Sequence, residues 1–325
     1  MSAFLLRRAL WFALTIWVVL TVSFFLMRAV PGGPFSADRS VDPIVEANLR
    51  KRYHFDWPLP LQYLQYTGPF NLDEHGLLGD RTRVLGGLLT GDLGPSFQYL
   101  DFSVNDVIRQ SLPISVQLGV SALLWAIGIG MVCGIASALR PHGALDLGVR
   151  LLATAGIALP NFVIAGFLIW VFSLTLPWFP VAGWGSPRHM VLPSLALGLP
   201  FAAYISRLLR TAMLEILSQS YIRTAIAKGM PAHIVIGRHA LKGALLPVIS
   251  YLGPASAGIL TGSLVIERIF FIPGTGSHFV QSALNRDYTL AMGVTLLYTG
   301  LVYVLNTLVD LAYTLIDPRI RTEEG

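Results

Sequence analysis

Six uncharged, apolar runs constrain this chain more than any other feature of its sequence. A helix needs about 20 predominantly apolar residues to cross the hydrocarbon core of a bilayer. Charged residues make up only 13% of the chain, against roughly a quarter in soluble domains. The sequence therefore predicts an all-α polytopic membrane protein with six spans. The runs are Ala9–Met27, Ile114–Leu139, Leu151–Trp178, Met190–Ser206, Gly243–Ile266 and Tyr288–Val309.

The first run follows Arg7 and Arg8 and is longer than the apolar part of a cleavable signal peptide, so we interpret it as a retained anchor. The runs divide the chain into four parts. These are a short N-terminal stub with the first span (1–28), a large loop region (29–113), a core that contains the other five spans (114–316) and a C-terminal tail (317–325).

The distribution of Lys and Arg predicts the orientation. The short segments on one side hold twelve such residues and the short loops on the other side hold three. The 29–113 segment exceeds the roughly 60 residues over which this rule counts. Both termini are therefore expected in the cytoplasm. The twelve are Arg7, Arg8, Arg140, Arg150, Arg207, Arg210, Arg223, Lys228, Arg238, Lys242, Arg319 and Arg321, and the three are Arg188, Arg268 and Arg286.

The 29–113 region is then extracytoplasmic. Its residues 42–66 favour short helices interrupted at Pro58 and Pro60, whereas residues 67–94 are rich in glycine and predict irregular structure. Two interpretations stay open for this region: an external cap that faces a receptor, or a solvated loop without a partner.

One polar, basic stretch separates the fourth and fifth runs, and we call residues 220–247 the basic segment. Its apolar positions follow helical spacing up to Lys228, Gly229 is typical of a helix C-terminus, and Pro231 is typical of the start of a second helix. The basic segment therefore predicts two short helices joined by a sharp turn, with small residues that allow another protein to approach closely.

The basic segment resembles the cytoplasmic coupling segment of ABC-importer permeases, in the oligopeptide and dipeptide branch. The resemblance rests on Tyr-Ile-Arg-Thr-Ala-Ile-Ala-Lys-Gly at 221–229, Arg-His-Ala-Leu-Lys at 238–242 and Leu-Leu-Pro-Val at 245–248. Arg223 and Thr224 replace the Glu-Ala of the general permease signature, which we interpret as a variant of the peptide branch. Further motifs resemble the same family, in order along the chain: Arg7-Arg8, Pro31–Phe35, Gly91–Ser96, Phe271–Gly276, Ala283–Tyr288 and Asp317–Arg319.

The resemblance implies a non-catalytic subunit of the cytoplasmic membrane that translocates oligopeptides or dipeptides. Partner subunits would bind ATP and magnesium, so the chain itself would hold no cofactor. The implied partners are a second homologous permease, two cytoplasmic ABC ATPases and an extracytoplasmic peptide-binding protein, with no nucleic acid. The coupling region would span 207–243, and its implied contact residues are Tyr221, Arg223, Thr224, Ala225, Ala227, Lys228, Gly229, Arg238 and His239.

Two alternatives to this function remain at this point. Permeases of the same family import nickel or glutathione, and a channel or membrane scaffold would need no ATPase. The sequence lacks the Gly-x-x-x-x-Gly-Lys-Ser/Thr phosphate loop, and the six apolar runs contain no carboxylate that could couple transport to an ion. His233 and His239 lie among arginines, which disfavours a metal site.

Prolines inside the apolar runs predict breaks in the spans. Pro160, followed by Asn161, is expected to break the third run, and Pro247 and Pro254 are expected to break the fifth. These residues are candidates for hinge or pathway-lining positions, although packing through small residues explains each of them as well.

Overall fold

The structure is a computed structural model that describes residues 2–29, 43–68, 87–99 and 102–316. The motifs at 31–35 and 317–319, and the tail 317–325, lie outside these residues. Within the described ranges the chain forms helices and two isolated β-bridges, with no β-strand. A lipid-exposed backbone must satisfy its hydrogen bonds within one segment, so helices are the expected solution, and the all-α prediction is confirmed.

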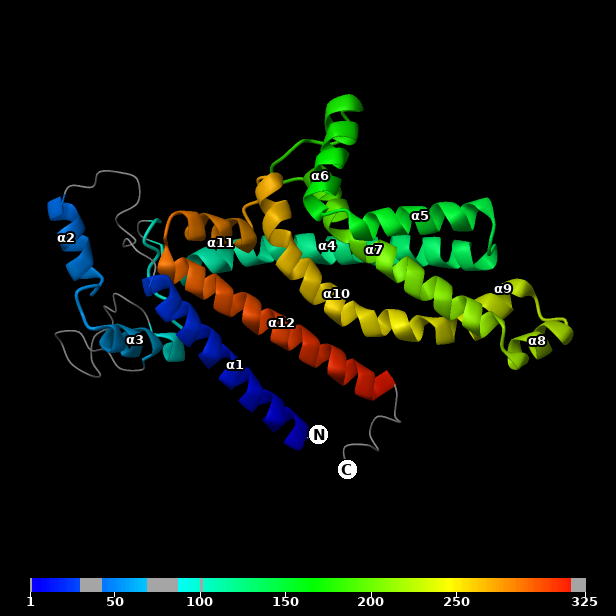
Figure 1. Ribbon diagram of the computed structural model, residues 1–325, viewed down its shortest axis with the longest axis horizontal. Coiled ribbons are helices and arrows are strands. Elements are labelled where there is room, and N and C mark those ends of the chain that lie inside the picture. Colours follow the sequence, from blue (N-terminus) through cyan, green and yellow to red (C-terminus); the bar gives the residue numbers. More distant parts are fainter. Residues whose placement is uncertain (1, 30–42, 69–86, 100–101, 317–325) are drawn as a thin grey trace. The chain divides into compact units, whose positions relative to one another are not determined.

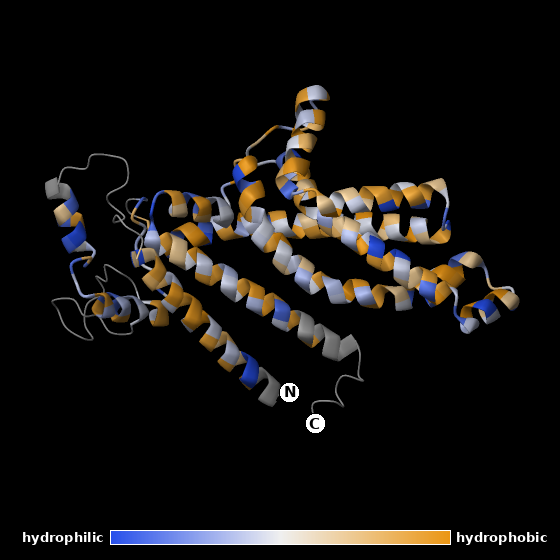
Figure 2. Cartoon of the chain, viewed as in Figure 1, coloured by the Kyte–Doolittle hydropathy of each residue, from blue (hydrophilic) through white to orange (hydrophobic). Residues whose placement is uncertain are grey.

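Five of the helices are long and apolar enough to cross a membrane, and a sixth span results if one bent pair of helices counts as a single span. Figure 2 shows the apolar residues along these helices and the hydrophilic residues on short elements such as α2 and α8. The long helices are α1 (Ser2–Ala29), α4 (Val104–Leu139), α7 (Pro187–Leu217), α10 (Leu241–Ile269) and α12 (Tyr288–Ile316). The bent pair consists of α5 (Ala144–Ala158) and α6 (Asn161–Ile169), which continues as a π-helical turn, η2 (Trp170–Thr175).

The short helices predicted within residues 42–66 are α2 (Pro43–Arg52) and α3 (Leu59–Thr67). Pro58 precedes α3 as predicted, but the predicted interruption at Pro60 is wrong, because Pro60 lies in the first turn of α3, where a proline costs no helical hydrogen bond. The helix α11 (Thr275–Leu284) was not predicted, and α4 begins at Val104 rather than at Ile114. Ser103 explains this earlier start. Its hydroxyl accepts the Asp106 N–H at 3.1 Å and the Asp106 carboxylate accepts the Ser103 N–H at 3.1 Å, which is a capping box.

The chain divides into two compact units. The first comprises residues 1–114 and 273–303, with the second formed by 115–272 and 304–325. In the first unit, Leu20 and Phe24 of α1 pack with Tyr66 of α3 and with Met292 and Leu296 of α12.

Asp287 joins two distant stretches of the first unit. Its buried carboxylate accepts the Ser96 hydroxyl at 2.5 Å, the Phe97 N–H at 3.2 Å and the Gln98 N–H at 3.3 Å, and it also accepts the Leu290 N–H at 3.2 Å at the start of α12. Two of the motifs singled out in the sequence, 91–96 and 283–288, therefore meet at one carboxylate.

The second unit is built around α7, which packs against α10, α5 and α6 (Figure 1). Glycines allow α4 and α7 to approach closely. A Cβ atom at Gly198 of α7 would lie 2.5 Å from the Ala122 carbonyl oxygen, and one at Gly134 of α4 would lie 2.9 Å from the Ser206 carbonyl oxygen. Small residues at such crossings let helix backbones pack directly against each other.

The proline predictions have two outcomes. At Pro160 the chain does break, and α5 and α6 meet at a bend of 112°. The predicted breaks at Pro247 and Pro254 are wrong, because both residues lie inside the uninterrupted helix α10. Each proline removes one backbone donor from the helix, and the packing of α10 along α7 holds the remaining turns in place.

Gly198→Ala should destabilise the protein by about 1–3 kcal/mol, because the new methyl group collides with the backbone of α4. Gly128→Ala is the matched control within α4, since nothing lies within 4 Å of a Cβ atom there. Alanine at that position should stabilise the helix by about 0.5–1 kcal/mol. Thermal unfolding of both purified variants in detergent measures the difference, and equal midpoints would contradict the close crossing.

Candidate functional site

The basic segment forms the predicted pair of short helices with a sharp turn. The first is α8 (Ser220–Ala227), and the second begins with the short α9 (Ala232–Ile234) and continues through a π-helical turn, η3 (Val235–Ala240), into α10. Pro231 stands at the N-cap of α9 rather than within it. The second short helix therefore continues without interruption into the long helix α10, and this continuity was not predicted from the sequence.

Gly229 ends α8 in the left-handed conformation, with φ +77°. The Gly229 N–H donates to the Ile226 carbonyl at 2.9 Å and the Met230 N–H donates to the Ala225 carbonyl at 3.2 Å. These two bonds form a Schellman motif, which favours glycine at this position. A Cβ atom on Gly229 would meet nothing within 4 Å. The backbone conformation, rather than crowding by this chain, is therefore the intramolecular reason for glycine here.

Buried apolar side chains anchor the two short helices of the basic segment within the second unit. Ile222, Ala225 and Val235 are buried, and they belong to one apolar cluster with Leu209 and Met213 of α7. Ala225 had been expected on the surface that a partner approaches. Its burial assigns it to the inner face of α8, where it fixes the position of the helix.

Two large side chains that flank this buried face of α8 are exposed. Tyr221 is 49% exposed and Ile226 is 60% exposed, although both carry large apolar groups. Ile226 was not among the expected contact residues, because its position in the apolar stripe of the helix predicts burial. Most of the expected contact residues also lie on the surface, and His239 is half-buried. The exposed ones are Arg223, Thr224, Ala227, Lys228, Gly229 and Arg238.

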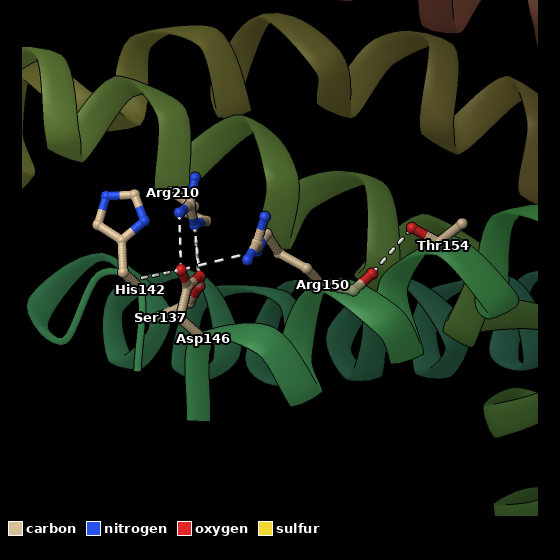
Figure 3. A network of polar contacts seen from close by, with 6 residues as sticks. All are labelled: Ser137, His142, Asp146, Arg150, Thr154 and Arg210. Atoms are coloured by element: carbon tan, nitrogen blue, oxygen red, sulfur yellow. Dashed lines mark hydrogen bonds and ion pairs between the residues drawn. The ribbon is translucent and has the colours of Figure 1, made fainter. Parts of the chain in front are cut away.

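A buried ion pair lies where α4, α5 and α7 come together (Figure 3). Arg210 of α7 donates two hydrogen bonds to the Asp146 carboxylate of α5, Nε to Oδ1 at 2.6 Å and Nη2 to Oδ2 at 2.8 Å. Ser137 of α4 donates its hydroxyl to the same carboxylate, and the His142 N–H donates at 3.0 Å. The Asp146 side chain is 0% exposed, so its charge depends on these partners.

This ion pair was not predicted from the sequence. Arg210 was counted only as a positive charge that sets the orientation, and Asp146 was not singled out. A usable signal was present, because Asp146 lies five residues before an apolar run and its charge needs a partner if the helix is packed there.

The candidate hinge residues occupy different environments. Asn161 directs its amide toward α10, where its Nδ2 would lie 3.5 Å from a Cβ atom at Gly262. Pro160 and Pro254 are exposed and Pro247 is half-buried. Near them in the second unit, Tyr204 of α7 stacks on Tyr251 of α10, with ring centroids 4.3 Å apart. No group of three His, Cys, Asp or Glu side chains that could hold a metal ion occurs in the described part of the chain.

Comparisons with known proteins give a consistent result. The family model described as "binding-protein-dependent transport system inner membrane component" matches residues 126–322. The oligopeptide transport system permease protein OppB of Salmonella typhimurium is 44% identical over 99% of this chain and 100% of its own length. The dipeptide transport system permease protein DppB of Bacillus subtilis is 44% identical over 99% of this chain and 98% of its own. The crystal structure of an amino acid ABC transporter shares the fold, with a TM-score of 0.51, 15% identity, and coverage of 64% of this chain and 92% of that one.

Arg210→Gln should lower the unfolding temperature by several degrees, because it leaves the buried Asp146 carboxylate without its main partner. Arg150→Gln is the control, since Arg150 reaches the same carboxylate at 3.6 Å from a side chain that is 48% exposed. That variant should unfold close to the wild type. The double variant Asp146→Asn, Arg210→Gln should recover part of the loss, and strict additivity of the two changes in a double-mutant cycle would contradict direct pairing.

Proposed function

Because the chain belongs to the family of binding-protein-dependent transport system inner membrane components, we propose that it is a permease subunit that carries oligopeptides or dipeptides across the cytoplasmic membrane. Relatives that match along their whole length are named for oligopeptide and dipeptide transport. This naming favours peptides over nickel or glutathione, and membership of a transport family favours a permease over a scaffold.

The energy for transport comes from ATPase partners in this proposal. The chain contains no Gly-x-x-x-x-Gly-Lys-Ser/Thr loop with which to bind ATP phosphates itself. The assembly would contain this chain, a second homologous permease, two cytoplasmic ABC ATPases and an extracytoplasmic peptide-binding protein. ATP and magnesium would be bound by the ATPases.

The construction of α8 is the observation that carries the proposal. Ile222 and Ala225 pack the helix into the apolar cluster that contains Leu209 and Met213 of α7, and Tyr221 and Ile226 on either side of them are exposed and available to a partner. Exposed large apolar groups on a short helix are typical of a docking surface. Because the Schellman motif at Gly229 fixes the end of the helix and the cluster fixes its base, α8 is suited to transmit a displacement to α7 and α10 as a unit.

We assign the mechanism on this basis. Closure of the two ATPases around ATP displaces the coupling segments of the two permeases, including α8 of this chain. The displacement reaches α7 and α10 through the buried cluster and opens the pathway to the binding protein, and hydrolysis returns the pathway to the inward-facing state. The bend at Pro160 is the candidate point at which a span changes direction without breaking the packed core of the second unit.

Gly229→Val should reduce peptide uptake per ATP hydrolysed by at least severalfold in the reconstituted importer. Valine disfavours the positive φ of this position, at a cost of roughly 1–2 kcal/mol, and also fills space next to the docking surface. Gly229→Asn separates the two causes, since asparagine tolerates the left-handed conformation but still adds bulk. Loss of coupling in both variants indicates close approach by a partner, whereas loss in the valine variant alone indicates backbone strain.

Gly91 provides a matched control for this experiment. It has φ +78° and nothing lies within 4 Å of a Cβ atom, as at Gly229, but it belongs to the predicted external region. Gly91→Val should therefore leave the ratio of uptake to hydrolysis unchanged. The coupling role of α8 is wrong if Gly229→Val keeps the wild-type ratio or if Gly91→Val lowers it equally.

The proposed orientation, with both termini in the cytoplasm, is testable by cysteine labelling. In a chain whose Cys133 is replaced by serine, single cysteines are placed at Leu89, which is 75% exposed, and at the exposed Ser218 before α8. An impermeant thiol reagent should label only Leu89→Cys in intact cells, and both variants after permeabilisation. Labelling of Ser218→Cys in intact cells would overturn the orientation.

A further inference from the structure

A pocket of about 370 Å³ lies between α5 and α7 in the second unit. Its lining residues occur at helical spacing on each helix, so each helix contributes one continuous face. They are Leu147, Arg150, Leu151 and Thr154 of α5, and Arg207, Arg210 and Thr211 of α7.

The pocket carries an excess of positive charge. Three arginines line it, and Asp146 behind it is the carboxylate that pairs with Arg210 and contacts Arg150. Arg207 is exposed and has no hydrogen-bond or ion-pair partner among the described residues. Three guanidinium groups against one carboxylate leave two positive charges for a ligand. The ion pair with Asp146 also holds the Arg210 side chain in place, so that part of the site is already organised.

The pocket lies where two helices leave the apolar part of the chain. The third apolar run begins at Leu151, so the lining residues 147–154 straddle its start, and the fourth run ends at Ser206, so the lining residues 207–211 follow directly after its end. Leu147 and Leu151 are exposed and lie beside Arg150 on the same face of α5. The site therefore combines cationic groups with apolar surface at the depth at which phospholipid headgroups meet acyl chains.

We propose that this pocket binds the phosphate group of an anionic phospholipid, with Arg207 and Arg150 as its cationic ligands. The planar guanidinium group of arginine matches phosphate oxygens with two parallel hydrogen bonds. The Thr211 hydroxyl lies one helical turn from Arg207 and is a further donor on the same face. The exposed Leu147 and Leu151 would contact the first carbons of an acyl chain. A free phosphate ion has no apolar part that would use this surface. This surface chemistry favours a lipid as the source of the phosphate.

Native mass spectrometry of the full-length chain, with the partners that co-purify, measures this binding. The protein is delipidated in neutral detergent and titrated with phosphatidylglycerol, with phosphatidylcholine as the zwitterionic comparison. The wild type should retain phosphatidylglycerol preferentially. Arg207→Gln should weaken its apparent affinity about fivefold, as expected for the loss of one cationic contact at an anionic surface. Arg207→Lys should retain part of the affinity, because it keeps the charge but loses the planar fork.

Arg188→Gln is the matched control. Arg188 is an exposed arginine at the opposite end of α7, outside the pocket, so its loss should leave the affinity unchanged. Equal affinities in the wild type and Arg207→Gln, or equal losses in both glutamine variants, would overturn the site. A parallel titration with inorganic phosphate distinguishes the source. If phosphate protects the wild type but not Arg207→Gln against thermal unfolding, and phosphatidylglycerol does not bind, the lipid assignment is wrong.

Discussion

Satisfaction of backbone hydrogen bonds in an apolar medium is the constraint on which the rest of the structure depends. An unpaired N–H or C=O group in hydrocarbon costs several kcal/mol, so the apolar runs adopt helices and change direction only at a few positions. The break before Pro160 is one such position. The π-helical turns at 170–175 and 235–240 lie within continuous helical stretches. A π-helical turn keeps the backbone paired while it adds a residue to the turn. The chain therefore departs locally from regular α-helical geometry at these turns without exposing its polar backbone.

The same constraint governs the buried charges. Asp146 is held by Arg210 and Ser137, and Glu267 accepts the Ser115 hydroxyl at 2.8 Å. These carboxylates lie near the ends of apolar runs rather than at their centres, where the cost of a charge is highest. Stable pairing at the ends of α4, α5 and α7 gives α8 a fixed base, since α7 leads directly into it.

Local signals in the sequence predicted what depends on local chemistry. The apolar runs predicted the spans, Pro160 predicted the bend, and Gly229 predicted the end of α8. Each of these features depends on residues that are close together in the sequence. The pairing of Asp146 with Arg210 spans 64 residues and depends on how α5 packs on α7, which no local pattern encodes. The continuity of α10 through Pro247 had the same cause, since packing against α7 outweighed the lost hydrogen bond. Ala225 was expected on the surface that a partner approaches but is buried. The eight residues of α8 offer few positions from which to infer which face of the helix is buried.

The carboxylate of Asp287 sets an order of events during synthesis of the chain. Its partner Ser96 precedes it by 191 residues, so at roughly 5–20 residues per second the loop at 96–98 leaves the ribosome about 10–40 s before its acceptor exists. The N-terminal helix α1 also lacks one of its partners until late in synthesis, because the Arg8 carbonyl accepts a hydrogen bond from the hydroxyl of Tyr303, which lies 295 residues later. The first unit can therefore close only after the last span has entered the membrane, whereas the second unit draws its core from residues 115–272 and can assemble while translation continues.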